Sequence, residues 1–188
     1  KYVRIGIRIR AEHRQFLIAK SDCVSEDGSK AFKYGGYGID IKGVKNYGQG
    51  NQGLYDTFDG KQNTDAIIAA TEGVKDSTGT VGAPAAEAAR AYRACTLEAD
   101  GIDDTTEWDL AAEGQDILMA TYKTEINELL TSLFGGINIL TNDWYWSSTE
   151  YDASSAWDVN MNYGYVGTND KIGAGRVRPV SAIDSLSL

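Results

Sequence analysis

Histidine is nearly absent from this 188-residue chain, and its scarcity excludes several kinds of chemistry. His13 is the single histidine, so a transition-metal site would have few ligands, and a Ser-His-Asp or Cys-His site would depend on it. No Gly-x-Ser-x-Gly elbow accompanies His13, for which we expect a surface or structural role. The phosphate-cradling Gly-x-x-x-x-Gly-Lys-Ser/Thr sequence is also missing. We therefore expect neither a metal nor a cofactor.

Basic residues are outnumbered, with 18 Lys and Arg against 27 Asp and Glu, which gives a formal net charge of −9. A chain of this charge repels phosphate backbones and anionic lipids, so nucleic acid is not an expected partner. No apolar run approaches the roughly 20 residues that span a bilayer, and we expect no membrane insertion. The length fits one domain over residues 1–188. Because the chain starts with Lys1 and not with Met, we expect a processed chain or a fragment of a longer protein, in the latter case its C-terminal part.

Cysteine is limited to Cys23 and Cys95, whose separation matches no zinc-binding pattern. The two residues are compatible with one disulfide and equally with two buried thiols, because the sequence does not tell how far apart their Cα atoms lie. Both alternatives stay open at this point.

Acidic residues are concentrated in residues 98–107, where no basic residue balances them. We expect a solvated loop here. Calcium binding is the alternative, although the ligand spacing of a calcium loop is missing.

Proline is also rare, with two residues against 21 glycines, which indicates a loop-rich molecule with many tight turns. The N-terminal part has a period-two pattern that predicts a half-buried strand, carried by Val3, Ile5, Ile7 and Ile9. Residues 16–19 are expected to form a second strand. Residues 34–51 are rich in glycine and are expected to form strand pieces joined by turns.

Three stretches have helical patterns. Residues 66–70 predict a short helix that is capped by Asn63 or Thr64 and ends near Gly73. Pro84 is expected to open a second, alanine-rich helix that extends to Cys95. Apolar spacing from residue 110 to residue 134 predicts one or two helices that end at the glycine pair 135–136.

From Asp143 onward the composition changes to aromatic and small polar residues, and we expect strands and turns. Alternation predicts that Trp157, Val159 and Met161 are buried, whereas Asp158, Asn160 and Asn162 are displayed. Of Trp144 and Trp146 we expect only one to face outward, with Trp146 and Trp157 in the core. A final strand is expected to carry Arg176 and Arg178 on one face.

Rigid aromatic rings among Tyr, Asn, Asp, Ser and Gly are typical of recognition surfaces, and this segment therefore favours ligand binding. An enzyme is the alternative. Carboxylates lie close to aromatics, as in a glycosidase cleft, and Glu150 and Asp158 are the pair that a glycan-acting enzyme would use as acid and base.

A family resemblance rests on the run from Trp146 to Tyr151, on Ala156-Trp157, on Gly164 and Lys171, and on residues 177–180. These segments resemble the C-terminal part of lectin-like domains related to the formylglycine-generating enzyme. The chain is more similar to the variable proteins of diversity-generating retroelements in gut Bacteroidetes and their phages. Matching segments occur in the family's order at residues 16–19, 35–38, 59–64, 85–95 and 108–130.

The resemblance implies an α+β chain with a C-type-lectin-like fold, in which a small twisted antiparallel sheet, two or more helices and long irregular loops support a diversified surface. It assigns to the scaffold Trp146, Ser147, Ser148, Ala156, Trp157, Gly164 and Arg178. It assigns to the ligand-binding surface Trp144, Tyr145, Asp152, Ser154, Ser155, Asp158, Asn160, Asn162, Tyr163, Tyr165, Asn169 and Asp170.

The function implied by the resemblance is non-enzymatic binding of a cell-surface protein or glycan. The chain would act as the tip of a phage or prophage tail fibre or as a surface adhesin, on the virion tail or at the bacterial cell surface. The closely spaced cysteines of the formylglycine-generating enzymes are missing, so the resemblance implies no inherited catalysis. A structural fibre knob that forms a homotrimer is a further alternative.

Overall fold

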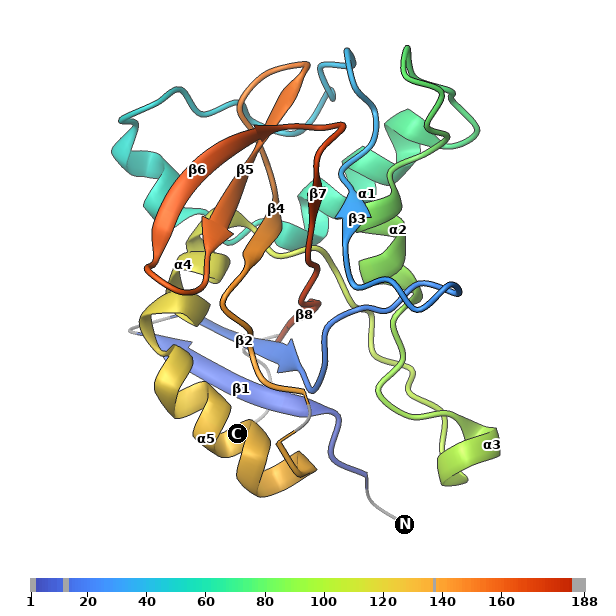
Figure 1. The fold of residues 1–188 in the computed structure, drawn as a ribbon, viewed down its shortest axis with the longest axis vertical. Helices are drawn as coiled ribbons and strands as arrows, with labels where there is room; N and C mark the ends of the chain where they lie inside the picture. The colour runs from blue at the N-terminus through green and yellow to red at the C-terminus, as the bar shows by residue number, and fades with distance from the viewer. Residues whose placement is uncertain (1–2, 12–13, 137, 184–188) are drawn as a thin grey trace.

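Two three-stranded antiparallel sheets form the frame of the chain (Figure 1). The computed structural model describes residues 3–11, 14–136 and 138–183, so the role predicted for His13 lies outside the described residues. In the first sheet, β1 (Gly6–Ala11) pairs with β2 (Arg14–Ala19), and β2 pairs with β8 (Val180–Ala182). Both N-terminal strands were predicted, although β1 begins later than Val3.

The second sheet is formed by β4 (Trp144–Glu150), β5 (Ser155–Asn160) and β6 (Tyr165–Asp170), in that order. Its central strand is β5, and a bulge interrupts the β4–β5 register between Trp146 and Glu150. A third, two-stranded sheet joins β3 (Phe32–Lys33) to β7 (Ala174–Gly175). The prediction of strands and turns after residue 143 is confirmed.

Two expected strands are wrong. Residues 34–51 form turns, with a single bridge from Asn46 to Glu150, because positive-φ glycines such as Gly36 and Gly43 reverse the chain too often for a ladder. Arg176 and Arg178 precede β8 rather than lie within a strand. Both guanidinium groups nevertheless reach the same carboxylate, that of Asp22.

Helix α1 (Gly60–Thr71) begins earlier than predicted, with Asp59 at its N-cap, and ends before Gly73 as expected. Asn63 and Thr64 are not caps, because their side chains bond inside the protein. The amide of Asn63 donates to Ser148 Oγ at 3.3 Å, and Thr64 Oγ1 accepts from the backbone of Leu110 at 3.0 Å. A short 3-10 helix, η1 (Gln52–Asp56), leads into this region.

Helix α2 (Pro84–Ala91) starts at Pro84 as predicted but stops before Cys95. The acidic stretch is more ordered than expected, since it contains the short helix α3 (Leu97–Asp100). In the same stretch Asp104 is buried and accepts hydrogen bonds from the backbone of Ala94 at 2.8 Å and from the indole of Trp108 at 2.7 Å.

Helices α4 (Glu113–Thr121) and α5 (Lys123–Phe134) confirm the prediction for residues 110–134. Gly135 ends α5 in the left-handed conformation, at φ 84°, which glycine adopts without steric cost. The described part of the chain is therefore α+β.

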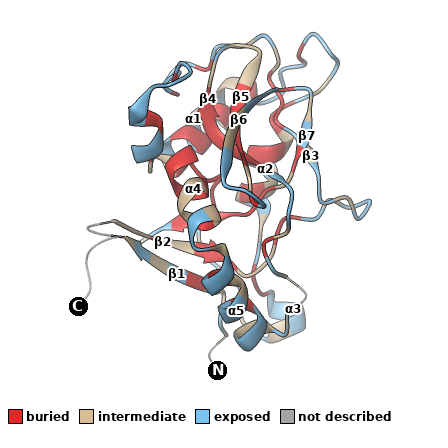
Figure 2. Cartoon of the chain, turned by 60° about the vertical axis from the view of Figure 1, so that its left-hand side comes forward, coloured by how far each residue is buried: buried red, intermediate tan, exposed pale blue. Residues whose placement is uncertain are grey.

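The core lies on both faces of the β4–β5–β6 sheet. On one face, Trp146 and Ala156 pack with Tyr34, Ile67 and Val177, next to α1 and α2. The opposite face carries Tyr145 and Val159, which pack with Phe16, Ile18 and Met119 beside α4 and α5. Figure 2 shows buried residues on the elements around this sheet and an exposed outer side of α5. The core placement predicted for Trp146 and Trp157 is confirmed.

Cys23 and Cys95 are both buried free thiols, which decides between the two alternatives in favour of thiols. The Cys23 thiol donates to the backbone oxygen of Ala88 at 3.3 Å, and burial raises its pKa. Among the residues that the structure describes, no helix is long and apolar enough to cross a membrane.

Candidate binding face

The register of the second sheet places Trp144, Asn160 and Tyr165 in one row across β4, β5 and β6. Side chains two residues further along a strand share the same face, so Asp158 and Gly167 lie in the next row with Trp146. We call this part of the sheet, with the adjoining turn, the aromatic face. Its members are Trp144, Asp158, Asn160, Tyr163, Tyr165, Gly167 and Asn169.

Trp144 and Trp146 share a face but differ in exposure, at 37% and 1% respectively. The prediction that one of them faces outward is therefore confirmed. Both side chains lie on the same side of the sheet, so their difference in exposure comes from their positions along β4. Trp144 lies at the open end of this strand, whereas Trp146 lies further along and is covered by the core. The Trp146 indole also donates to the backbone oxygen of Phe32 at 2.8 Å, which holds it inside.

The turn between β5 and β6 holds two tyrosines together. Tyr163 and Tyr165 are 69% and 65% exposed, and their rings are stacked with centroids 5.4 Å apart. Asn160 Oδ1 accepts from the backbone of Asn162 at 2.9 Å and of Tyr163 at 3.3 Å, and Gly164 provides the left-handed residue of the turn at φ 67°. Asn160 therefore orients Tyr163 through the backbone.

Asp158 was predicted to be displayed, but it is buried, with 4% of its surface exposed. The reason is Gly167, directly opposite on β6. A Cβ atom there would lie 2.9 Å from Asp158 Oδ1 and 3.0 Å from Trp144 Cζ3, so the indole and the carboxylate occupy the space that a side chain would fill. Burial raises the pKa of Asp158 to about 7, and a hydrogen bond from Asn169 opposes that rise.

Tyr145 was also predicted to be displayed, and this is wrong. Alternation turns it to the opposite face of the sheet, where it is fully buried in the core beside Val159. Its hydroxyl lies 3.0 Å from Asp22 Oδ2 and accepts from the backbone of Thr141 at 3.1 Å. Burial and the nearby Asp22 raise the pKa of Tyr145 to about 12.

Four other predicted residues lie at the far end of the β5–β6 hairpin. Ser155 pairs with Asp170, five positions from the pair Asn160 and Tyr165, which corresponds to about 17 Å along a strand. Asp152 Oδ1 accepts from the backbone of Ser154 and Ser155, each at 2.8 Å, as a turn-forming aspartate does. The structure therefore does not bring all predicted residues together. Some of them lie on the aromatic face or, like Asn162, in the turn beside it. The others lie on a second rim, formed by Asp152, Ser154, Ser155 and Asp170.

Glu150, the expected acid of a glycan-acting enzyme, forms an ion pair with Lys171 in which both side chains are 0% exposed. Glu150 Oε2 also accepts from the backbone of Ile41 at 3.1 Å, and Lys171 Nζ donates to the backbone oxygen of Ile39 at 2.8 Å. The pair joins β4 and the end of β6 to the loop after β3. These contacts hold both side chains in the interior, which is a scaffold role.

Two buried carboxyl groups were missed by the sequence analysis. Glu113 and Asp116, in the first turn of α4, are almost fully buried, and no hydrogen-bond partner reaches Glu113 Oε1, Glu113 Oε2 or Asp116 Oδ2 within the described residues. Burial raises the pKa of Glu113 to about 8, and the nearby Asp158 adds to the rise. The hydroxyl of Ser147 opposes it without reaching hydrogen-bond geometry. The pKa of Asp116 is raised by burial and then by Glu113 and Asp158.

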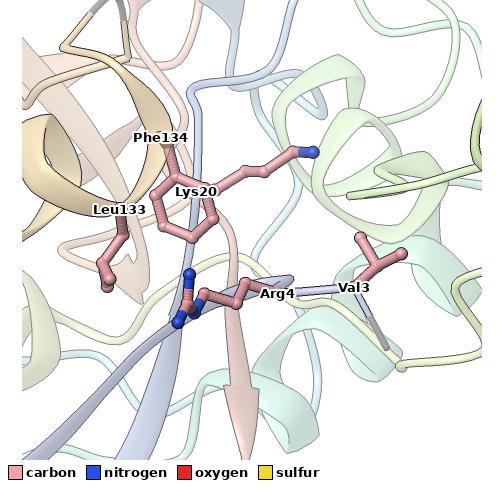
Figure 3. Close-up of a pocket in the computed structure, with 5 residues that line it drawn as sticks. All are labelled: Val3, Arg4, Lys20, Leu133 and Phe134. Carbon is pink, nitrogen blue, oxygen red and sulfur yellow. The ribbon is translucent and has the colours of Figure 1, made fainter. Parts of the chain in front are cut away.

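A separate pocket of about 560 Å³ lies where β1 and β2 meet the end of α5 (Figure 3). Arg4 and Lys20 line it together with Val3, Leu133 and Phe134. Two cationic groups beside apolar side chains suit an anionic group with an apolar neighbour. None of the predicted ligand-binding residues lines this pocket. No sequence pattern indicates that the N-terminal residues that line it lie next to the end of α5.

Within residues 3–11, 14–136 and 138–183, no group of three or more His, Cys, Asp or Glu side chains is arranged to hold a metal ion. No model of a known protein family and no curated protein sequence matches the chain. On the aromatic face, exposed rings lie on a hydrogen-bonded sheet.

Proposed function

We propose that this chain is a non-enzymatic binding domain that recognises a cell-surface protein or glycan through its aromatic face. The observation that carries the proposal is the stacked pair Tyr163 and Tyr165, about two-thirds exposed at the end of a rigid hairpin. Large rings fixed in place provide contact area at a low entropic cost, which is why tyrosine and tryptophan are frequent among the residues that dominate binding energy. The proposal includes a C-type-lectin-like fold and a diversified surface.

Three features support recognition through this face. Asn160 orients Tyr163 before any ligand binds, so little freedom is lost on binding. β6 hydrogen-bonds to β5 along its whole length, which fixes Tyr165 and Asn169 relative to Trp144. Asn162 and Asn169 are exposed and supply donors and acceptors around the rings. The surface therefore combines rigid apolar anchors with adaptable polar groups.

The same proposal includes the family to which the chain belongs and the place where it acts. As a member of the variable proteins of diversity-generating retroelements, it would lie at the tip of a phage tail fibre or on a bacterial surface. The neighbouring DNA tests this part. We expect a near-copy of the segment that encodes residues 144–178, which differs mainly at adenines and lies beside a reverse transcriptase gene. A complete genome segment with neither feature would contradict the diversification but not the binding.

Replacement of Trp144, Asn160, Tyr163 and Tyr165 by alanine is expected to abolish binding. Loss of several anchor residues costs at least about 3 kcal/mol, or more than about 100-fold in affinity. The measurement is attachment of the fluorescently labelled chain to bacterial cells that bind the wild type, with circular dichroism to verify the fold.

The matched control removes two exposed tyrosines elsewhere, Tyr55 and Tyr122, and should leave attachment unchanged. The Asn160→Ala variant alone should weaken binding less than removal of the two hairpin tyrosines, because Asn160 acts through the turn. Wild-type attachment in the fourfold variant would refute the assignment of the binding surface.

A further inference from the structure

The electrostatic character of the aromatic face indicates what kind of group binds there. Between Trp144 and Asp170 the sequence contains four carboxylates and no lysine or arginine. One of the four, Glu150, is neutralised by Lys171 in the interior. Of the other three acids, Asp158 lies on the aromatic face, whereas Asp152 and Asp170 lie on the second rim at the far end of the hairpin.

The basic groups next to the rim of β4 are already engaged. Arg176 forms ion pairs with Asp143 at 2.9 Å and with Asp22 at 3.2 Å. Lys123 donates to the side chain of Asn142. The carboxylate of the aromatic face is therefore that of Asp158, and Arg176 and Lys123 are bonded to other groups.

The geometry around Gly167 places one carboxylate next to an exposed ring. Asp158 Oδ1 and the six-membered ring of Trp144 both lie within about 3 Å of the position that a Cβ atom of Gly167 would take. Trp144 thus has its inner side next to Asp158 and Gly167, while more than a third of its surface faces solvent. The face of an aromatic ring attracts cations through its quadrupole, and an ionised carboxylate near the ring adds a Coulombic attraction.

We propose that the group recognised by the aromatic face is a cation, the guanidinium of arginine or the ammonium of lysine on the surface of a protein partner. This inference rests on the proposed function and names the chemistry of its ligand. Trp144, Tyr163 and Tyr165 supply ring faces for the cation, and Asp158 supplies a negative charge next to Trp144. A neutral glycan carries no cation for the ring faces to attract.

The charge state of Asp158 makes such binding depend on pH. Trp144 of β4 and Gly167 and Asn169 of β6 surround its carboxyl group, and Glu113 and Asp116 of α4 are the titratable groups that interact with it. Because the pKa of Asp158 is raised to about 7, the group is mostly protonated below that pH and mostly ionised above it. Cation binding should therefore strengthen as the pH rises through neutrality.

Short peptides test the inference directly. The probes are Gly-Gly-Arg-Gly-Gly and the same peptide with citrulline, the neutral isostere of arginine. Binding is followed by tryptophan fluorescence, which reports on Trp144 because the other three tryptophans are buried. We expect the arginine peptide to bind at least about tenfold more tightly than the citrulline peptide, and several-fold more tightly at about pH 8 than at about pH 6.

The Asp158→Asn variant keeps the size of the side chain and should lose the pH dependence. Trp144→Ala should lose the discrimination between arginine and citrulline, measured by calorimetry because the fluorescent reporter is then absent. Equal affinity for the two peptides, or a pH dependence as large in Asp158→Asn as in the wild type, would overturn the inference. If the fourfold alanine variant loses attachment to cells while the peptides bind equally, the proposed function stands and the cationic ligand does not.

Discussion

Raising the pH from about 5 to about 9 is expected to lower the free energy of unfolding of this protein by about 4–6 kcal/mol. This loss is a large part of the total stability of a typical protein, which is about 5–15 kcal/mol. The cause is the group of buried carboxyls formed by Glu113, Asp116 and Asp158. Two oxygens of Glu113 and one of Asp116 have no hydrogen-bond partner in the part of the chain that the structure describes, so nothing compensates a negative charge there. Near neutral pH the folded protein holds Glu113 mostly protonated and Asp158 about half protonated.

The sign follows from proton counting. Burial raises the pKa of Glu113 from 4.5 to about 8, so between these values the folded state binds a proton that the unfolded state has released. The free energy of unfolding falls as the pH rises through this interval, by about 1.4 kcal/mol for each pH unit and each such proton. Asp158 acts in the same direction between 3.8 and about 7. Because the three groups interact, their contributions are not additive.

The measurement is urea unfolding, followed by tryptophan fluorescence at several pH values. The variant Glu113→Gln/Asp116→Asn should flatten the dependence above pH 5, since neutral amides replace the groups that titrate. Acids with a lowered pKa, such as Asp76 and Asp104, lose stabilising hydrogen bonds below about pH 4, so maximal stability is expected in mildly acidic solution. A flat or rising stability between pH 5 and pH 9 in the wild type would be inconsistent with buried, protonated carboxyls.

Substitution of Lys171 by methionine is expected to cost about 3–5 kcal/mol, because it leaves the buried carboxylate of Glu150 without its counter-charge. For a chain of this length, each kcal/mol lowers the melting temperature by roughly 2–4 °C, so a fall of about 6–20 °C is expected. Ile41 continues to donate to Glu150 Oε2, but one backbone hydrogen bond does not neutralise a charge. Thermal unfolding by circular dichroism measures the change.

A second substitution separates the loss of charge from the loss of packing. Glu150→Gln in the Lys171→Met background should recover most of the stability, because no unpaired charge remains inside. Lys61 provides the matched control. It pairs with Asp65 and Glu107 at the surface with 39% of its side chain exposed, and Lys61→Met should cost less than about 1 kcal/mol. Equal losses for Lys171→Met and Lys61→Met would contradict the structural role of the buried pair.

The elements that the sequence predicts well are those with a strong local signal. Pro84 fixes the start of α2, and Gly135 fixes the end of α5, because each residue restricts or relaxes its own backbone. The burial of Trp157, Val159 and Met161 follows from alternation along β5 and past its end. In these cases the nearest neighbours in sequence determine the outcome.

The errors arise where a distant segment decides. Asn63 can cap a helix, but its amide bonds to Ser148, which is 85 positions away, and α1 therefore extends past it. Tyr145 is in the interior because Asp22 and the core beside α4 lie behind that side of β4. Alternation predicts that Asp158 is displayed, yet it is enclosed because its neighbour on β6 is a glycine. The sequence around a polar residue in a strand does not show which residue of the neighbouring strand lies opposite.

The same dependence on the neighbouring strand has a consequence for sequence change. β6 is the outer strand of its sheet, and its backbone, not its side chains, bonds it to β5. Most of its side chains face water, so substitution at Tyr165, Thr168 or Asn169 removes little buried surface. Gly167 and Val166 are exceptions, because a residue larger than glycine displaces the indole of Trp144 and because Val166 packs against the buried Trp157. Evolution can thus change the exposed positions of this strand freely, provided that Gly167 and the apolar side chain at position 166 are retained.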